Sequence, residues 1–187
     1  LAGVVLAGGA YVTASRGEAG GSASHEGAEA RATLRNAAGV KVGSVKLEQE
    51  GDSVKLKVKV DDSVAPGFHG FHVHGVGLCD AVSTPPVATD PFTTAGGHYN
   101  PGAVTHDDHA GDLPVLLIDG DGEAEARFAT DRFALGDLIA DDGSAFILHA
   151  NADNYANIPA SYGGPVGATL NTGDAGSRIA CGIVESD

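Results

Sequence analysis

The chain of 187 residues contains no Met and no Trp, and only 5% of its residues are aromatic. The absence of Met leads us to expect that a leader has been trimmed from the N-terminus or was never included. With so few aromatic residues, Val, Leu, Ile and Ala must fill the core, and a hydrophobic content of 42% is enough for one. This composition argues against disorder throughout the chain.

Positive charge is scarce in the second part of the chain. Residues 1–60 hold eight Lys and Arg against six acids, whereas residues 61–187 hold three Arg against nineteen acids. The net charge is therefore +2 over residues 1–60 and −16 over residues 61–187, which gives −14 for the whole chain. A negative field of this size repels nucleic-acid phosphates and anionic lipid. We expect no nucleic-acid partner and no polybasic membrane clamp. The same field should also repel an anionic substrate.

Cysteine is limited to Cys79 and Cys181. The two residues form no CxxC motif, so the sequence indicates neither a thiolate metal site nor a dithiol redox site. A single structural disulfide, formed in an oxidising compartment, is the better interpretation.

The first 29 residues differ in composition from the rest. Residues 1–14 are apolar and uncharged but too short by themselves to span a bilayer, and we interpret them as the end of a signal or membrane-anchor segment. A mobile Ala/Gly-rich tail is the alternative. The residues that follow are rich in Gly, Ser, Ala and Glu, which is typical of a flexible linker. We expect the folded domain to occupy residues 30–187.

A period of two dominates the hydrophobic pattern of that domain. Four apolar residues over 54–60 alternate with Lys, which predicts a strand half-buried in an antiparallel sheet. Further strands are expected over 40–47, 70–76, 113–118, 123–129, 144–149 and 178–184, with a helical turn over 135–140. So many short strands predict an all-β sandwich or barrel. Two segments, 77–112 and 150–177, are too long to be turns and are expected to be functional loops.

Seven of the eight His lie in or near those two loops. On a strand, residues i and i+2 share a face, so His72 and His74 can reach one ion. His149 ends an apolar strand, where an isolated His is more often a satisfied core side chain. Together with the pair it supplies a third imidazole, and an all-imidazole site favours copper.

A second cluster combines three imidazoles with one carboxylate within fifteen residues. Its members are His98, His106, His109 and Asp112. Three nitrogens and one oxygen suit a closed, structural zinc site. The alternative is a solvated acidic loop that contains His by chance.

Four segments resemble, in order, the signatures of the copper,zinc superoxide dismutases. They are GFHGFHVHGVGLCD (67–80), AGGHYNP (95–101), HAGDLP (109–114) and NTGDAGSRIACGIV (171–184). The resemblance covers residues 30–187 and implies an eight-stranded Greek-key β-barrel with two long functional loops. It also implies dismutation of superoxide to oxygen and hydrogen peroxide by a redox-active copper, with a histidine-bridged zinc that holds the geometry.

The resemblance further implies which residues bind the two metals. The copper ligands would be His72, His74, His98 and His149. The zinc ligands would be His98, His106, His109 and Asp112. His98 would therefore bridge the metals, and it would also take up a proton during catalysis.

Other residues gain supporting roles from the same resemblance. Asp153 would orient one ligand of each metal, and His69 would brace the active-site loop. Cys79 and Cys181 would form the family's intrasubunit disulfide. Thr172 and Arg178 would line the channel above copper, with the Arg178 guanidinium as a positive target for superoxide.

Two departures from the family pattern concern the zinc loop and the channel. Only Asp107 and Asp108 separate two predicted zinc ligands, a spacer shorter than expected, which puts zinc affinity in question. Asn171 stands where many members carry Lys, so steering rests more heavily on Arg178.

Two other functions compete with dismutation. A metal-storing module of the same fold is one alternative, but such proteins typically lose the bridging His, a copper ligand or the channel Arg, which are all present here. A zinc hydrolase built on the His pair would need an open zinc position and a general base.

A trimmed leader, a disulfide and superoxide chemistry together predict a location outside the cytoplasm, in the periplasm or cell envelope or as a secreted protein, with a role in protection against superoxide there. The sequence leaves open whether residues 1–29 anchor the protein in a membrane or are cleaved. It also leaves open whether the chain forms a homo-oligomer.

Overall fold

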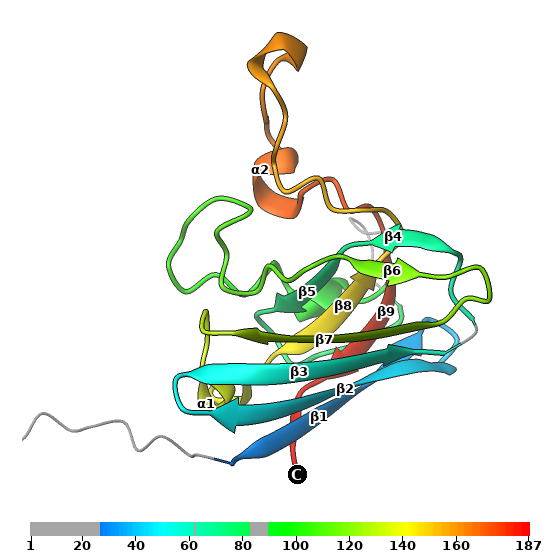
Figure 1. Cartoon of the computed structure of the whole chain (residues 1–187), viewed down its shortest axis with the longest axis vertical. Coiled ribbons are helices and arrows are strands. Elements are labelled where there is room, and N and C mark those ends of the chain that lie inside the picture. Colours follow the sequence, from blue (N-terminus) through cyan, green and yellow to red (C-terminus); the bar gives the residue numbers. More distant parts are fainter. Residues whose placement is uncertain (1–26, 62, 83–89) are drawn as a thin grey trace, which may run out of the picture.

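The computed structural model describes residues 27–61, 63–82 and 90–187, which fold around a curled antiparallel sheet that forms a half-barrel (Figure 1). Its strands are β1 (Glu29–Asn36), β2 (Lys41–Glu50), β3 (Ser53–Val60), β5 (Phe71–His74), β7 (Ala124–Thr130), β8 (Ala145–His149), β9 (Arg178–Ile183) and β10 (Glu185–Ser186). They follow the order β5-β8-β9-β1-β2-β3-β7, and β10 pairs with β1. A separate pair is formed by β4 (Gly67–His69) and β6 (Leu116–Ile118).

The predicted all-β fold is confirmed, with eight strands in the main sheet. Strands β3 and β7 are neighbours although three strands separate them in the chain, and so are β1 and β9. Antiparallel strands that pair after a long connection in the chain are typical of Greek-key topology. Because β5 and β7 remain edges of the hydrogen-bonded path, the barrel is only half closed by backbone pairing.

The strand predicted over 54–60 lies within β3, and its alternation is confirmed. Its four apolar side chains are buried, while Lys55 and Lys59 are exposed. A two-residue turn joins β2 to β3, since Glu50 pairs with Ser53 across it. Gly51 opens this turn at φ 54°, a left-handed conformation that glycine adopts without steric cost.

The hydrophobic pattern of the sequence did not predict three of the strands, which are β1, β4 and β10. In β1 the buried positions include Ala30 and Ala32, whose small side chains give little hydrophobic contrast with their neighbours. Strands β4 and β10 have three and two residues, too few to show a period. The helical turn predicted over 135–140 is α1 (Leu135–Ile139).

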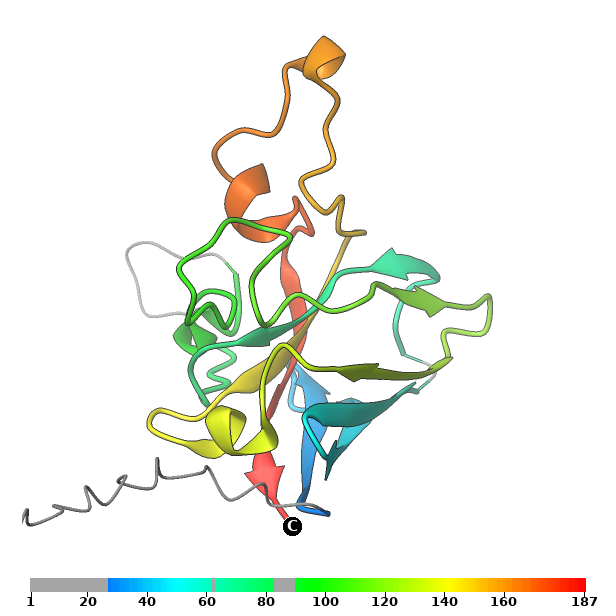
Figure 2. The same cartoon turned by 60° about the vertical axis from the view of Figure 1, so that its left-hand side comes forward.

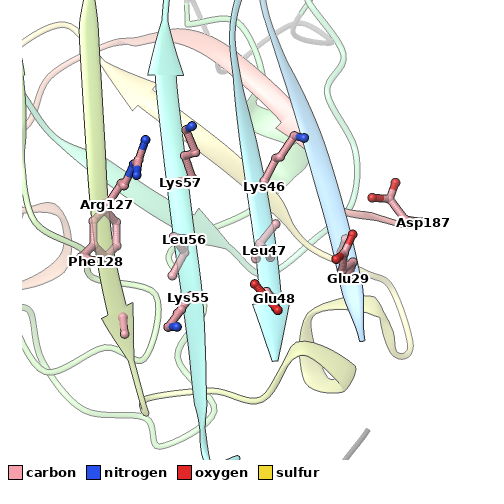
Figure 3. A pocket seen from close by; sticks show the side chains of 12 residues that line it. Glu29, Lys46, Leu47, Glu48, Lys55, Leu56, Lys57, Arg127, Phe128 and Asp187 are labelled. Carbon is pink, nitrogen blue, oxygen red and sulfur yellow. The ribbon is translucent and has the colours of Figure 1, made fainter. Parts of the chain in front are cut away.

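The outer face of the sheet carries much of the chain's positive charge. Lys46, Lys57 and Arg127 lie directly opposite one another across β2, β3 and β7 (Figure 3). Like charges in register are unfavourable, and Glu125 offsets them through ion pairs with Lys57, Lys59 and Arg127. These strands occupy one end of the sheet order, whereas the histidine-bearing strands β5 and β8 occupy the other.

Both long loops are present as predicted. The first includes a 3-10 helix over Thr93–Ala95, and the second includes another over Ala160–Tyr162 followed by α2 (Thr169–Thr172). The second loop projects away from the half-barrel (Figure 2). Among the helices of the described residues, none combines the length and the apolar character that a membrane crossing requires. The predicted apolar segment and most of the linker, residues 1–26, lie outside the described residues.

The expected disulfide is confirmed between Cys79 in the first loop and Cys181 in β9, with their Cα atoms 5.7 Å apart. Cys181 is buried and packs in a small apolar cluster with Phe92, Ala95, Ala145 and Ile147. The bond therefore ties the first long loop to a central strand of the sheet.

The loop closed by this disulfide spans 102 residues, so its loss should cost a large part of the stability. In the chain-entropy description, a loop of that size contributes about 4–5 kcal/mol to the free energy of unfolding. We expect that decrease in urea unfolding of the Cys79→Ser, Cys181→Ser double variant, measured without metal. Reduction of the wild-type protein should lower the free energy equally, and a double variant as stable as the oxidised protein would contradict the account.

Candidate metal centre

The predicted ligands come from two strands and the first long loop. His72 and His74 lie on β5, and His149 is the last residue of the neighbouring strand β8. Two isolated β-bridges dock the loop on β5, one between His72 and Asp112 and one between His74 and His98. Backbone pairing thus brings residues far apart in sequence to the same end of the sheet.

Four imidazoles form a first cluster, named here the copper-side cluster after the metal predicted for it. They are His72, His74, His98 and His149, and one nitrogen of each lies within 4.8 Å of the others. The ring centroids of His72 and His98 are 4.1 Å apart, and those of His74 and His98 are 5.0 Å apart. All four side chains are buried.

Hydrogen bonds fix which nitrogen of each ring faces the centre of this cluster. His74 donates from Nδ1 to the carbonyl of Gly96, and His149 donates from Nδ1 to the carbonyl of Gly176, both at 2.9 Å. Because a carbonyl only accepts, Nδ1 carries the proton in both rings and Nε2 keeps a free lone pair. His72 has the opposite tautomer, since its Nε2 donates to Asp153 at 2.7 Å.

The imidazole nitrogens that make no hydrogen bond are the feature of this cluster that fits a metal ion. Nδ1 of His72 and Nε2 of His74, His98 and His149 are all buried and have no hydrogen-bond partner among the described atoms. A buried nitrogen lone pair without a partner is unfavourable unless something coordinates it. Four of them converging on one point suit an ion that prefers imidazole, such as copper.

The second cluster gathers three imidazoles around the Asp112 carboxylate. Nδ1 of His98 lies 2.7 Å from Oδ1 of Asp112, and Nδ1 of His106 lies 3.0 Å from Oδ2. Nδ1 of His109 is 3.3 Å from the carboxylate and also 3.3 Å from Nδ1 of His98. The four side chains are buried, and their chemistry matches a closed zinc site.

His98 belongs to both clusters, with Nδ1 in the second and Nε2 in the first. Its ring is therefore placed between the two candidate metal positions.

Asp153 connects the clusters from the other side. Its Oδ2 accepts from Nε2 of His72 at 2.7 Å, and its Oδ1 accepts from Nε2 of His106 at 2.8 Å. The backbone N–H of Tyr155 donates to Oδ1 as well, at 2.7 Å. One carboxylate thereby orients a ring of each cluster.

The charges of these groups follow from burial and from the two carboxylates. Burial lowers the pKa of His98 to about 4, against the opposing effect of Asp112, and lowers the pKa of His149 to about 3. Burial also opposes protonation of His106, but hydrogen bonds to Asp112 and Asp153 outweigh it and raise the pKa to about 9. Both carboxyls have pKa values well below their usual range, because hydrogen bonds from His106 and its neighbours outweigh their burial. At pH 7 the rings of His98 and His149 are therefore neutral, as coordination requires.

The remaining predicted residues lie around this centre. Arg178 donates to the carbonyls of Phe92 and Gly96, both at 2.6 Å, and its charge contributes to the low pKa of His74 and of His149. His69 is buried and its Nδ1 contacts the carbonyl of His149 at 2.7 Å. Thr172, on α2, is exposed and donates to the carbonyl of Ala168, and its place in a channel stays a prediction.

Sequence reasoning missed the groups that act through the backbone. The carbonyls of Gly96 and Gly176 fix two tautomers, yet a carbonyl leaves no signature in the sequence. Gly173 was missed too: at φ 57°, it lies so close to Asp153 that a Cβ would overlap Oδ1 of the carboxylate and lie 2.5 Å from Nε2 of His106. The only available signal was its position within the NTGDAGSRIACGIV segment.

Comparison with known proteins gives one family. The family described as copper/zinc superoxide dismutase (SODC) matches residues 41–184. The chain is 39% identical over 165 residues to the Cu-Zn superoxide dismutase of Mycobacterium tuberculosis, covering 82% of this chain and 69% of that protein. It is 33% identical to the enzyme of Photobacterium leiognathi, covering 79% and 80% of the two chains.

Two solved structures share the fold. A double mutant of a SOD-like protein from Bacillus subtilis superposes with a TM-score of 0.61 at 29% identity, covering 82% of this chain and 95% of the other. The clock protein EA4 superposes with a TM-score of 0.65 at 25% identity, covering 85% and 94%.

Gly173 allows a direct test of whether Asp153 links the two clusters through its hydrogen bonds to His72 and His106. Gly173→Ala should displace the carboxylate from two buried rings, which we expect to cost about 3–5 kcal/mol of the free energy of unfolding of the metal-free protein. Gly163→Ala is the matched control, because Gly163 also has a positive φ, 98°, but nothing lies within 4 Å of its Cβ position. The control should lose about 1–2 kcal/mol from backbone strain alone. Equal losses in the two variants would contradict the link.

The pKa values predict a stability maximum near pH 6.5 for the metal-free protein. Below that pH, His98 and His149 resist protons that the unfolded chain binds, so stability falls as pH decreases toward about 4. Above it, His106 holds a proton that the unfolded chain has released, so its contribution is lost as pH rises to about 9. Each group changes the free energy by up to about 1.4 kcal/mol per pH unit. Urea unfolding from pH 4.5 to 9 should show both slopes, and His106→Gln should remove the alkaline one.

Proposed function

The chain belongs to the copper/zinc superoxide dismutase family, and on that premise we propose that its two joined clusters dismute superoxide outside the cytoplasm, each with its own metal. Copper is assigned to His72, His74, His98 and His149, and zinc to His98, His106, His109 and Asp112. The observation that carries this assignment is the set of four buried, unpartnered nitrogens that meet at one point beside a second cluster sharing one ring.

Bound copper would supply one-electron transfer to and from superoxide, and the chain would supply the geometry and relay protons from solvent. Dismutation converts two superoxide ions and two protons into one molecule each of oxygen and hydrogen peroxide, so the site needs a proton carrier. Nε2 of His98 faces the copper-side cluster and is the atom to which we assign proton uptake. Its other nitrogen is held toward Asp112, which keeps the ring in place as Nε2 changes protonation.

Arg178 is the group proposed to attract and orient superoxide. Two backbone carbonyls hold its guanidinium, so the positive charge has a fixed position close enough to influence His74 and His149. Only three Arg occur over residues 61–187. Arg127 lies on the outer face with Glu125, and Arg132 contacts the backbone of the zinc-side loop, so Arg178 is the Arg assigned to the copper side.

The disulfide supports a location outside the cytoplasm, because such bonds persist in oxidising compartments. A periplasmic, cell-envelope or secreted protein fits this observation, and protection against superoxide there is the corresponding role.

A pair of ligand variants tests the assignment. His149 belongs only to the copper-side cluster and His109 only to the zinc-side cluster. After reconstitution with both metals, His149→Ala should retain zinc, lose most of its copper and lose at least about 100-fold in dismutase activity, because loss of a residue that only orients a ligand already costs about 10- to 100-fold. His109→Ala should lose zinc and retain copper. Metal analysis and the superoxide assay are made on the same samples, and an His149→Ala variant with full activity would refute the copper assignment.

A further inference from the structure

The spacer between His106 and His109 contains only Asp107 and Asp108, and both are exposed. The short turn is held by Asp108, whose N–H donates to the carbonyl of Thr105 at 2.9 Å. Two residues cannot build a secondary structure of their own that would fix the two imidazoles around Asp112. Beyond these local hydrogen bonds, contacts from outside the spacer can fix its position.

One external anchor is Arg132, which no part of the proposed function uses. Its Nη1 donates to the carbonyl of Asp107 at 2.9 Å and to the carbonyl of His109 at 3.0 Å. A single guanidinium nitrogen therefore holds both ends of the peptide segment that contains Asp108. On the opposite side, the N–H of His106 donates to the carbonyl of Leu170 in the second long loop, at 2.9 Å.

The base from which Arg132 reaches is rigid. The adjacent Phe133 is only 4% exposed and packs in the main core, and the N–H of Leu135 donates to the buried amide of Gln49 at 2.7 Å. The N–H of Arg132 itself donates to Thr130 Oγ1 at the end of β7. The guanidinium is therefore carried on a segment fixed to the sheet.

From this geometry we infer that Arg132 is a positioning residue for the zinc-side cluster, which it holds through the backbone of the two-residue spacer. The inference rests on the proposed function, because it assigns zinc to that cluster. It explains how so short a spacer keeps His106 and His109 in place: the sheet, through Arg132, does what a longer loop would do with its own hydrogen bonds.

A simple electrostatic role for Arg132 predicts the opposite effect. A positive charge beside a cation site repels the cation, so removal of that charge alone should strengthen zinc binding. Loss of a positioning contact should weaken it, because outer contacts that orient metal ligands typically contribute about 10- to 100-fold to affinity. The sign of the change therefore distinguishes the two roles.

The test is the zinc affinity of the full chain, measured without copper by competition with a chromophoric chelator at pH 7 and 0.15 M salt. Arg132→Met should weaken zinc binding by about 10- to 100-fold. Arg132→Lys, which keeps the charge and several donors, should restore part of the loss. Arg127→Met is the matched control. Arg127 lies on β7 and its guanidinium binds Glu125, so its loss should change the zinc affinity by less than about twofold.

Circular dichroism at 25 °C establishes that each variant is folded before zinc is added. If Arg132→Met does not fold, Arg132→Gln replaces it, since the shorter amide cannot hold both carbonyls, and it too should bind zinc more weakly than the control. Zinc binding by the Arg132 variants that is as tight as in the wild type, or tighter, overturns the inference.

The outcomes also separate this inference from the proposed function. A wild-type protein that binds zinc but does not dismute superoxide refutes the proposed function. The zinc affinities of the Arg132 variants then still decide the inference. An active wild-type protein whose Arg132 variants bind zinc normally refutes the inference alone. A wild-type protein that binds no zinc overturns both the zinc assignment and the role of Arg132.

Discussion

The arrangement of the whole centre depends on two buried carboxylates, Asp112 and Asp153. Asp112 contacts the three imidazoles of the zinc-side cluster, and Asp153 joins one of them to a ring of the copper-side cluster. Buried anions are unfavourable unless donors surround them, and here the donors are the same imidazoles that the metals require. In the metal-free protein, His106 lies between both carboxylates, and its raised pKa means that a proton partly balances their charge. The fold thus holds the rings in place before any ion arrives.

Much of the site could be predicted from the sequence because metal ligands are few in type and regular in spacing. The alternation of His72 and His74 on a strand determines a shared face, and the grouping of His98, His106, His109 and Asp112 determines a donor set. Membership of His149 could not be derived from spacing, since it depends on the pairing of β8 with β5, a contact across 75 residues of chain. Its residue type suggested membership beside the other His, and the resemblance to a family then implied it as a copper ligand.

The parts that escaped prediction depend on backbone atoms or on small residues. Strand β1 was missed because Ala at its buried positions gives a weak pattern, although β1 lies at the centre of the sheet order. The carbonyls of Gly96 and Gly176 select the tautomers of two ligands, and any residue could provide such a carbonyl. The spacer of two residues raised doubt about zinc affinity for a related reason: the sequence shows the length of a loop but not the contacts that its backbone accepts.

A chain with a net charge of −14 should repel the superoxide anion, so the charges close to the site matter more than the total. Most cations of the first 60 residues lie on strands β1, β2 and β3, and none of these strands carries a predicted metal ligand. Arg178, in contrast, contacts the loop that carries His98. The carbonyl of Gly96 accepts hydrogen bonds both from Arg178 and from Nδ1 of His74, so the predicted channel cation and a predicted copper ligand share one acceptor. The disulfide holds the same loop to β9, the strand that begins with Arg178. A shift of this loop would therefore move the Arg178 guanidinium and the His74 ring together, because both donate to the same peptide carbonyl.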